Sequence, residues 1–162
     1  MSVVTSTRSV LVDTVGTAVF AAVVAIGVPL RDERAAQFAV GVVSMVLFAI
    51  GAVTALWAYI SALERSRVDE IGVANLYLLT GPTAPRPVKR LMSGLLAAQV
   101  IIALTGAIVG SMGLSGSEVN ALAFGVLVPM LGIGLNGIWA VRHGTFGPRV
   151  DPGVHSSNRP ID

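Results

Sequence analysis

Four long stretches of this chain contain no charged residue, and they fix the class of structure it can form. They cover residues 14–30, 35–63, 91–117 and 119–141. An α-helix needs about 20 apolar residues to cross the hydrocarbon core of a bilayer. Such a helix satisfies its own backbone hydrogen bonds, as an environment without water requires. The sequence therefore predicts an all-α protein, a four-helix transmembrane bundle, with the lipid bilayer as its surroundings.

The composition leaves little material for a domain outside the membrane. The chain has 162 residues, of which 54% are hydrophobic and 12% are charged, whereas soluble domains carry about 25% charged residues. We expect a cytoplasmic N-terminus over residues 1–8, one membrane domain over 9–147 and a disordered cytoplasmic tail over 148–162. The chain has no cysteine, which excludes disulfides and cysteine-based metal sites. We expect no metal, no cofactor and no catalytic residue.

The predicted spans cover residues 9–30, 37–60, 91–113 and 120–141, and a cytoplasmic loop covers 61–90. We expect the first span to be retained, because the sequence after it lacks the small-residue pattern of a signal-peptide cleavage site. Within the loop, an uncharged run is too short to cross the membrane. Three of its side chains are expected to lie flat on the membrane surface: Leu76, Tyr77 and Leu79.

Basic residues flank mainly one face of the predicted bundle, the face that carries both termini. They are Arg8, Arg65, Arg67, Arg86, Lys89, Arg90, Arg142, Arg149 and Arg159, with only Arg31 and Arg34 on the other face. Because basic residues accumulate on the cytoplasmic side, we expect both termini to be cytoplasmic (N-in and C-in). Aromatic residues at the same ends of their spans are expected at the membrane–water interface: Trp57, Tyr59 and Trp139. This pattern makes anionic lipid headgroups candidate ligands and does not indicate nucleic acid.

Small residues recur at four-residue spacing in the third span, which predicts a face for close helix packing. The series is Gly94, Ala98, Ile102, Gly106 and Gly110. Lipid tails are as apolar as leucine, so membrane helices associate where small residues let their backbones approach. Gly125 and Gly132 extend the same prediction to the fourth span. We expect packing within this chain's own bundle, and the alternative is a seam for a second copy or another membrane protein.

The fourth span contains a proline and a polar amide. Pro129 lacks an amide donor and crowds the carbonyl of Gly125, so we expect a kink that frees one acceptor. Asn136 is the one strongly polar side chain well inside this span. An intramembrane amide usually bonds a neighbouring helix and contributes about 1 kcal/mol. The alternative for Asn136 is a role in solute binding or gating.

Asp13 is the one acidic residue inside a predicted span. Intramembrane carboxylates often take part in proton-coupled transport. The position of Asp13, four residues after Ser9, favours instead a carboxylate at the headgroup boundary near a helix N-terminus, where the helix dipole stabilises negative charge. Gln99, in the third span, can pair with either Asp13 or Asn136.

Two segments, residues 77–85 and 137–149, carry a family resemblance. In these two segments the chain resembles the small four-span conserved membrane proteins of actinobacteria, of the mycobacterial type. The resemblance covers most of the chain and implies the bacterial inner membrane, but it implies no activity. Small multidrug transporters share the four spans and an acidic residue in the first, yet they are shorter, carry a glutamate and lack a central loop of this length.

These observations predict a non-enzymatic accessory or scaffold subunit of a membrane complex, bound to a membrane-protein partner or to itself. The prediction rests on the small-residue faces and on the lack of buried ionisable pairs. The alternative is a small-solute transporter or channel that acts as a homo-oligomer. That alternative rests on Asp13, Gln99, Asn136 and the kink at Pro129.

Overall fold

The computed structural model describes residues 2–112 and 121–149, with side chains from Arg8 onward. Four helical stretches are long and apolar enough to cross a membrane: Arg8–Gly27, Arg34–Arg65, Arg86–Ser111 and Ala121–His143. The prediction of an all-α bundle with four candidate spans is therefore confirmed. The predicted disordered tail covers 148–162, but Pro148 lies in a short strand and the Arg149 amide is hydrogen-bonded to Val68, so the prediction is wrong for these two residues. The rest of the predicted tail and the predicted connection at 114–119 lie outside the described residues.

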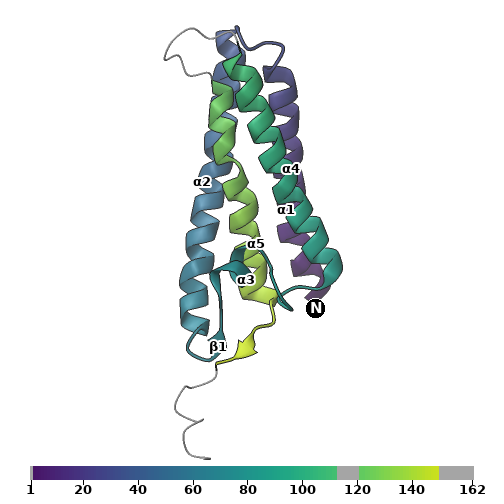
Figure 1. The fold of residues 1–162 in the computed structure, drawn as a ribbon, viewed down its shortest axis with the longest axis vertical. Helices are drawn as coiled ribbons and strands as arrows, with labels where there is room; N and C mark the ends of the chain where they lie inside the picture. The colour runs from purple at the N-terminus through teal and green to yellow at the C-terminus, as the bar shows by residue number, and fades with distance from the viewer. Residues whose placement is uncertain (1, 113–120, 150–162) are drawn as a thin grey trace, which may run out of the picture.

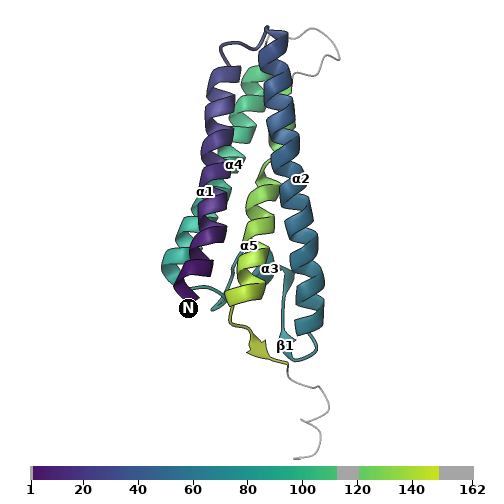
Figure 2. The same cartoon turned by 180° about the vertical axis from the view of Figure 1, so that it is seen from behind.

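The helices pack side by side along one long axis and alternate in direction (Figures 1 and 2). They are α1 (Ser2–Gly27), α2 (Arg34–Arg65), α4 (Arg86–Ser111), and a fourth rod made of the 3₁₀ helix η1 (Ala121–Leu127) and α5 (Pro129–His143). The described chain begins and ends at the same end of the bundle. At that end lie the short helix α3 (Val73–Tyr77) and the strands β1 (Asp69–Glu70) and β2 (Gly147–Pro148). We call residues 66–85 and 144–149 the cap.

Most helix bounds differ from the predicted spans, because charge patterns mark the membrane-compatible part of a helix and not its ends. Helix α1 ends at Gly27 and not at residue 30, since Pro29 follows and disfavours helical backbone at the residue before it. Helix α4 begins at Arg86, five residues early. Pro87 falls in its first turn, where the missing N–H has no intrahelical partner, so proline is tolerated there.

Pro129 divides the fourth span into two helices and does not merely kink it. The chain forms the 3₁₀ helix η1, and α5 then starts at Pro129. The Gly125 carbonyl accepts a hydrogen bond from the amide of Val128 at 3.0 Å. The prediction that this carbonyl is freed is therefore wrong. The tighter 3₁₀ pattern satisfies it from the residue before the proline.

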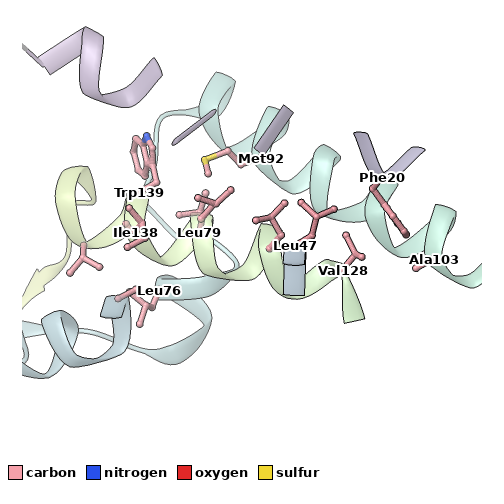
Figure 3. Packing of buried hydrophobic residues seen from close by; sticks show 14 of the residues in the cluster. Phe20, Leu47, Leu76, Leu79, Met92, Ala103, Val128, Ile138 and Trp139 are labelled. Atoms are coloured by element: carbon pink, nitrogen blue, oxygen red, sulfur yellow. The ribbon is translucent and has the colours of Figure 1, made fainter. Parts of the chain in front are cut away.

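The core runs along the inside of the bundle, with side chains from α1, α2, α4, η1 and α5, and continues into the cap (Figure 3). Its largest fully buried apolar side chains are Phe20, Leu79, Met92, Leu131 and Val128. Trp139 also lies in this core with 3% of its surface exposed, so its predicted interfacial position is wrong. Trp57 is 45% exposed, and the guanidinium carbon of Arg142 lies 4.9 Å from its ring centroid. Large apolar side chains elsewhere point outward, as expected for a surface that faces hydrocarbon.

The predicted small-residue face packs against this chain's own helices at most of its positions. A Cβ added at Gly106 would lie 3.2 Å from Val24, and one at Gly110 would lie 2.8 Å from Leu122. Gly125 faces the Phe20 ring in the same way, and Ala98 is half-buried. Gly94 is exposed, and a Cβ there would meet nothing within 4 Å. Gly94 therefore does not pack within this chain's own bundle, and the alternative seam for a second copy or another membrane protein stays a prediction.

The closest helix crossing involves glycines that the spacing argument did not select. A Cβ added at Gly51 of α2 would lie closer than 3.0 Å to backbone atoms of Met130 and Leu131 in α5. A Cβ at Gly134 would come as close to the Gly51 carbonyl oxygen and to Thr54 Oγ1. Helices α2 and α5 therefore touch backbone to backbone at the level of the helix break.

The segment after α2 folds back onto the bundle instead of lying on the membrane surface. Leu76 is 2% exposed and Leu79 is fully buried. The Tyr77 ring fills the space beside Gly137 of α5, and its hydroxyl donates a hydrogen bond to the Ala55 carbonyl of α2 at 3.0 Å. The prediction that these three loop side chains lie flat on the membrane is wrong, because the glycine in α5 opens a site for the Tyr77 ring within the protein.

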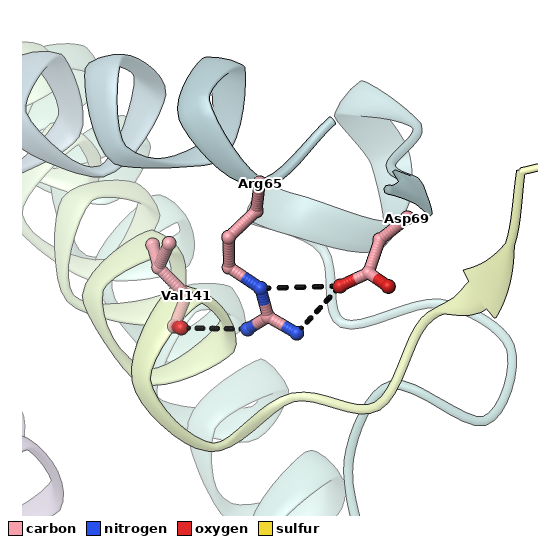
Figure 4. Close-up of polar contacts among 3 residues, drawn as sticks. All are labelled: Arg65, Asp69 and Val141. Carbon is pink, nitrogen blue, oxygen red and sulfur yellow. Dashed lines mark hydrogen bonds and ion pairs between the residues drawn. The ribbon is translucent and has the colours of Figure 1, made fainter. Parts of the chain in front are cut away.

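Two short strands and an arginine tie the cap together. Strand β1 pairs antiparallel with β2, with Asp69 opposite Pro148 and Glu70 opposite Gly147. At the end of α2, the Arg65 guanidinium donates to one Asp69 carboxylate oxygen at 2.8 and 3.2 Å and to the Val141 carbonyl at 2.8 Å (Figure 4). The charge pattern made Arg65 a candidate ligand of anionic lipid headgroups, but its guanidinium is engaged within the protein.

Candidate intramembrane polar site

Three helices bring four polar groups together inside the bundle. The Gln99 side chain of α4 donates from Nε2 to Asp13 Oδ1 and to Thr17 Oγ1 of α1, each at 2.8 Å. The Thr17 hydroxyl in turn donates to the Asp13 backbone carbonyl at 2.7 Å. The Gln99 Oε1 atom accepts a hydrogen bond from the Gly132 amide of α5 at 3.2 Å. We call Asp13, Thr17, Gln99 and the Gly132 amide the polar site.

The helix break supplies the amide that this site uses. Val128 is the N-cap of α5, and its carbonyl accepts a hydrogen bond from the Leu131 amide at 2.8 Å. The Gly132 N–H donates instead to Gln99 Oε1. Its missing side chain lets Gln99 reach it, since a Cβ there would lie 2.8 Å from Gln99 Oε1. Gly132 was predicted as a helix-packing residue, and the structure gives it this second use.

The surrounding contacts fix the orientation of the Gln99 amide. Its Nε2 faces two oxygen acceptors, and its Oε1 faces the Gly132 N–H. A flipped amide would place oxygen against the Asp13 carboxylate and an NH₂ group against an N–H donor. The hydrogen-bond network therefore assigns nitrogen to the Asp13 side and oxygen to the α5 side.

Asp13 is fully buried, which corrects the favoured interpretation of this residue. Helix α1 begins at Ser2, so Asp13 is far beyond the first turn, where the helix dipole acts. Its Oδ1 bonds Gln99, and its Oδ2 has no hydrogen-bond partner among the described residues. Burying an ionised carboxylate is costly unless it is paired. Asp13 is therefore an interior polar group and not a carboxylate at the headgroup boundary.

Asn136 does not belong to this site. Its Nδ2 donates to the Tyr77 backbone carbonyl at 2.9 Å, so it joins α5 to the end of α3. Both Asn136 and Gln99 are fully buried, but the structure pairs Gln99 with Asp13. The amide of Asn136 thus anchors the cap, which is a structural use of the kind predicted, although the acceptor lies in the loop segment and not in a spanning helix.

Thr17 is the member of the polar site that the sequence analysis missed. It lies four residues after Asp13, so the two side chains share one face of α1. This i, i+4 spacing was available in the sequence as a signal. Threonine hydroxyls bond the preceding turn of their own helix so commonly that such a residue does not stand out by type alone.

The Tyr77 hydroxyl provides a test of how firmly the cap is held. Burial raises the pKa of Tyr77 above its ordinary value of 10.0, and the Tyr59 hydroxyl raises it further. The stability that Tyr77 contributes is therefore complete below pH 10.0 and is lost as the pH rises through the raised value. We expect Tyr77→Phe to cost about 1 kcal/mol near neutral pH, because the bond to Ala55 is lost, and to weaken the alkaline loss of stability.

The measurement is unfolding in detergent micelles as a function of pH. Tyr59→Phe is the matched control and should keep most of the alkaline dependence, because burial of Tyr77 is the larger cause of its shift. Equal alkaline profiles for Tyr77→Phe and the wild type would show that the Tyr77 hydroxyl does not hold the cap.

The chemistry of the polar site is that of one carboxylate held by neutral donors at the start of a half-helix. In membrane transporters, broken helices place such termini beside the ions and solutes that they bind. Comparison with known proteins adds no relative from which a role can be transferred. No protein-family model, curated protein or solved structure matches this chain.

Proposed function

We propose that this chain is a small transporter or channel, acting as a homo-oligomer, that binds a small ion or solute at Asp13. The observation that carries the proposal is the fully buried Asp13 carboxylate, bonded by Gln99 beside the break between η1 and α5. Ionisable residues inside membrane helices are costly, and they usually mark ion or substrate pathways. A carboxylate that served structure alone would be replaced by an apolar residue at little cost.

The scaffold hypothesis loses part of its support. It rested partly on the lack of buried ionisable pairs, and that premise stands, because Asp13 is bonded to the neutral Gln99 amide; the hypothesis nevertheless gives the buried Asp13 carboxylate no use. It also rested on small-residue faces, and Gly106 and Gly110 face side chains of their own bundle. One observation still favours it as the second candidate. The cap is held by hydrogen bonds such as that from Arg149 to Val68 (3.0 Å), so it presents a defined surface at the end of the bundle.

The expected location is the bacterial inner membrane with both termini in the cytoplasm. The excess of basic residues on the face that carries the termini supports this orientation. The chain has no cysteine, so single cysteines report topology without a background. We expect Ser115→Cys to react with an impermeant maleimide applied to intact spheroplasts, and Ser156→Cys to react only after lysis. Equal labelling of the two, or the reverse order, would refute the N-in and C-in assignment.

Transport is tested with the purified chain in vesicles adsorbed on a solid-supported electrode. Concentration jumps of protons, alkali cations and small organic cations are applied in turn, and the charge moved is recorded. We expect at least one jump to give a protein-dependent current that Asp13→Asn abolishes. The substituted amide can still accept from Gln99, so the unfolding temperature should stay close to that of the wild type.

Asp32→Asn is the matched control, because Asp32 is an exposed carboxylate in the turn between α1 and α2. It should leave the current unchanged. Currents that survive in Asp13→Asn would refute the proposed function. A stoichiometric foreign membrane protein that co-purifies with a wild type giving no current would replace the proposal with the scaffold hypothesis.

A further inference from the structure

We infer that the species bound at Asp13 is a proton and not a metal cation, and that Gln99 enforces this choice. The inference rests on the proposed function and names the substrate class of the same site. It starts from the hydrogen-bond directions in the polar site, which decide how many oxygen atoms are free to hold a ligand.

The polar site offers too few free oxygen atoms to a metal cation. Hard cations such as Mg²⁺ and Ca²⁺ take about six to eight oxygen ligands. The Gln99 Oε1 is occupied by the Gly132 amide, and Asp13 Oδ1 and Thr17 Oγ1 both accept from Gln99 Nε2. Asp13 Oδ2 remains as the one carboxylate oxygen without a partner. Gln99 therefore points N–H groups at the place where a cation would need oxygen.

A proton needs only the one atom that is left. When Asp13 binds a proton at Oδ2, the carboxylate becomes a neutral carboxylic acid, and a hydronium ion that delivered the proton becomes water. Oδ1 keeps its hydrogen bond from Gln99 in both states. Release reverses the step and restores the negative charge, which the Gln99 N–H at Oδ1 then faces. Both protonation states therefore fit the same arrangement of helices.

No other charge in the described part of the chain lies close enough to replace the proton. The titratable groups of the helices that pack against α1 lie near the helix ends: Arg86, Lys89 and Arg90 of α4; Arg34, Tyr59, Glu64 and Arg65 of α2; Arg142 and His143 of α5. Helix η1 has none, and α1 itself has Arg8. The nearest of these along the chain is Arg8, which precedes Asp13 by five residues, about 7.5 Å along the axis of α1. Arg8 is exposed whereas Asp13 is buried, and the described residues form no ion pair between the two. Asp13 thus has no cation paired with it, and a proton is the simplest way to neutralise it.

The test uses the full chain in phosphatidylcholine vesicles and does not need a transport substrate. Infrared difference spectroscopy follows the carbonyl band of protonated carboxylic acids while the pH is varied over the range in which the protein stays folded. We expect a titrating band that disappears in Asp13→Asn and remains in Asp32→Asn. In Gln99→Leu the band should move to higher wavenumber, because the carbonyl at Oδ1 loses its donor. A purely structural role for Gln99 would not move a carboxyl band.

The same titration of the wild type, carried out in different salts, distinguishes a bound proton from a bound metal cation. The titration is repeated at equal ionic strength in sodium, potassium, magnesium and choline chloride. We expect the same midpoint in all four. A midpoint that falls in one metal chloride shows competition by that cation and overturns the inference, while the proposed transport function stands. The absence of any Asp13-dependent band also overturns it. Conversely, a proton band without currents would refute the proposed function and leave the proton site.

Discussion

Gly51→Ala is expected to destabilise the folded bundle more than any other single methyl addition to α2. The new Cβ would meet backbone atoms of Met130 and Leu131, which cannot rotate away as a side chain can. Helices α2 and α5 would have to move apart along their whole contact. Overpacking of this kind typically costs about 1–3 kcal/mol and occasionally more. The measurement is unfolding in detergent micelles, followed by the fluorescence of the buried Trp139.

Gly94→Ala is the matched control for this experiment. Gly94 also lies within a long helix, but it is exposed and a Cβ there meets nothing within 4 Å. Alanine is favoured over glycine in a helix by about 1 kcal/mol, so this variant should be as stable as the wild type or slightly more stable. Gly134→Ala tests the same crossing from the α5 side. Similar unfolding of Gly51→Ala and Gly94→Ala would show that the two backbones do not touch there.

The glycines show how far spacing alone can predict helix packing. The series in α4 was visible because its members repeat every four residues, and Gly106 and Gly110 do lie against neighbouring helices. Gly94 continues the same series but is exposed, and a Cβ there would meet nothing within 4 Å, although Met92 two residues earlier is fully buried. Gly51 is a single glycine among alanines and larger residues, and its importance depends on what α5 places opposite. A periodic pattern predicts a face, whereas the partner of each position comes only from the three-dimensional packing.

The same distinction applies to the polar site. The sequence offered pairing of Gln99 with Asp13 as one of two alternatives, while the position of Asp13 favoured the headgroup boundary. The interpretation of Asp13 was wrong because it used only the position of Asp13 near the start of the span. That position does not show which residues of other helices cover the side chain. The amide of Gly132 was not predictable from side-chain chemistry. It becomes a donor only because Pro129 starts a new helix, so the site depends on a backbone feature that residue types do not show.

The cap was the part of the fold that the sequence analysis placed worst. An uncharged run beside membrane spans has the composition of a surface-bound segment, and Leu76 and Leu79 satisfy that pattern. The alternative, burial against α5, depends on space beside Gly137 and on the Asn136 amide, which donates to the Tyr77 carbonyl. Both features lie more than fifty residues away along the chain, so local composition does not reveal them.

Gln99→Leu is expected to be far more damaging than Asp13→Leu, although both changes remove the same hydrogen bond. Loss of Gln99 leaves Asp13 Oδ1 and the Gly132 amide without their observed partners in a buried site. Each buried unsatisfied group costs about 1–3 kcal/mol, and a charged one costs more. Loss of Asp13 leaves Gln99 bonded to Thr17 and to Gly132, so little is left unsatisfied. Unfolding in micelles at neutral pH measures both variants.

The double variant Asp13→Leu/Gln99→Leu separates this cause from simple loss of packing. With the carboxylate gone, removing Gln99 no longer leaves a buried charge unpaired, so the double variant should be more stable than Gln99→Leu alone. Groups in one hydrogen-bond network couple by about 0.5–3 kcal/mol, whereas groups without shared partners add. Asn136→Leu is the control partner, because Asn136 bonds Tyr77 and shares no hydrogen bond with Asp13. If the stability changes of Asp13→Leu and Gln99→Leu simply add, as those of Asp13→Leu and Asn136→Leu are expected to, then the carboxylate and the Gln99 amide do not form one site.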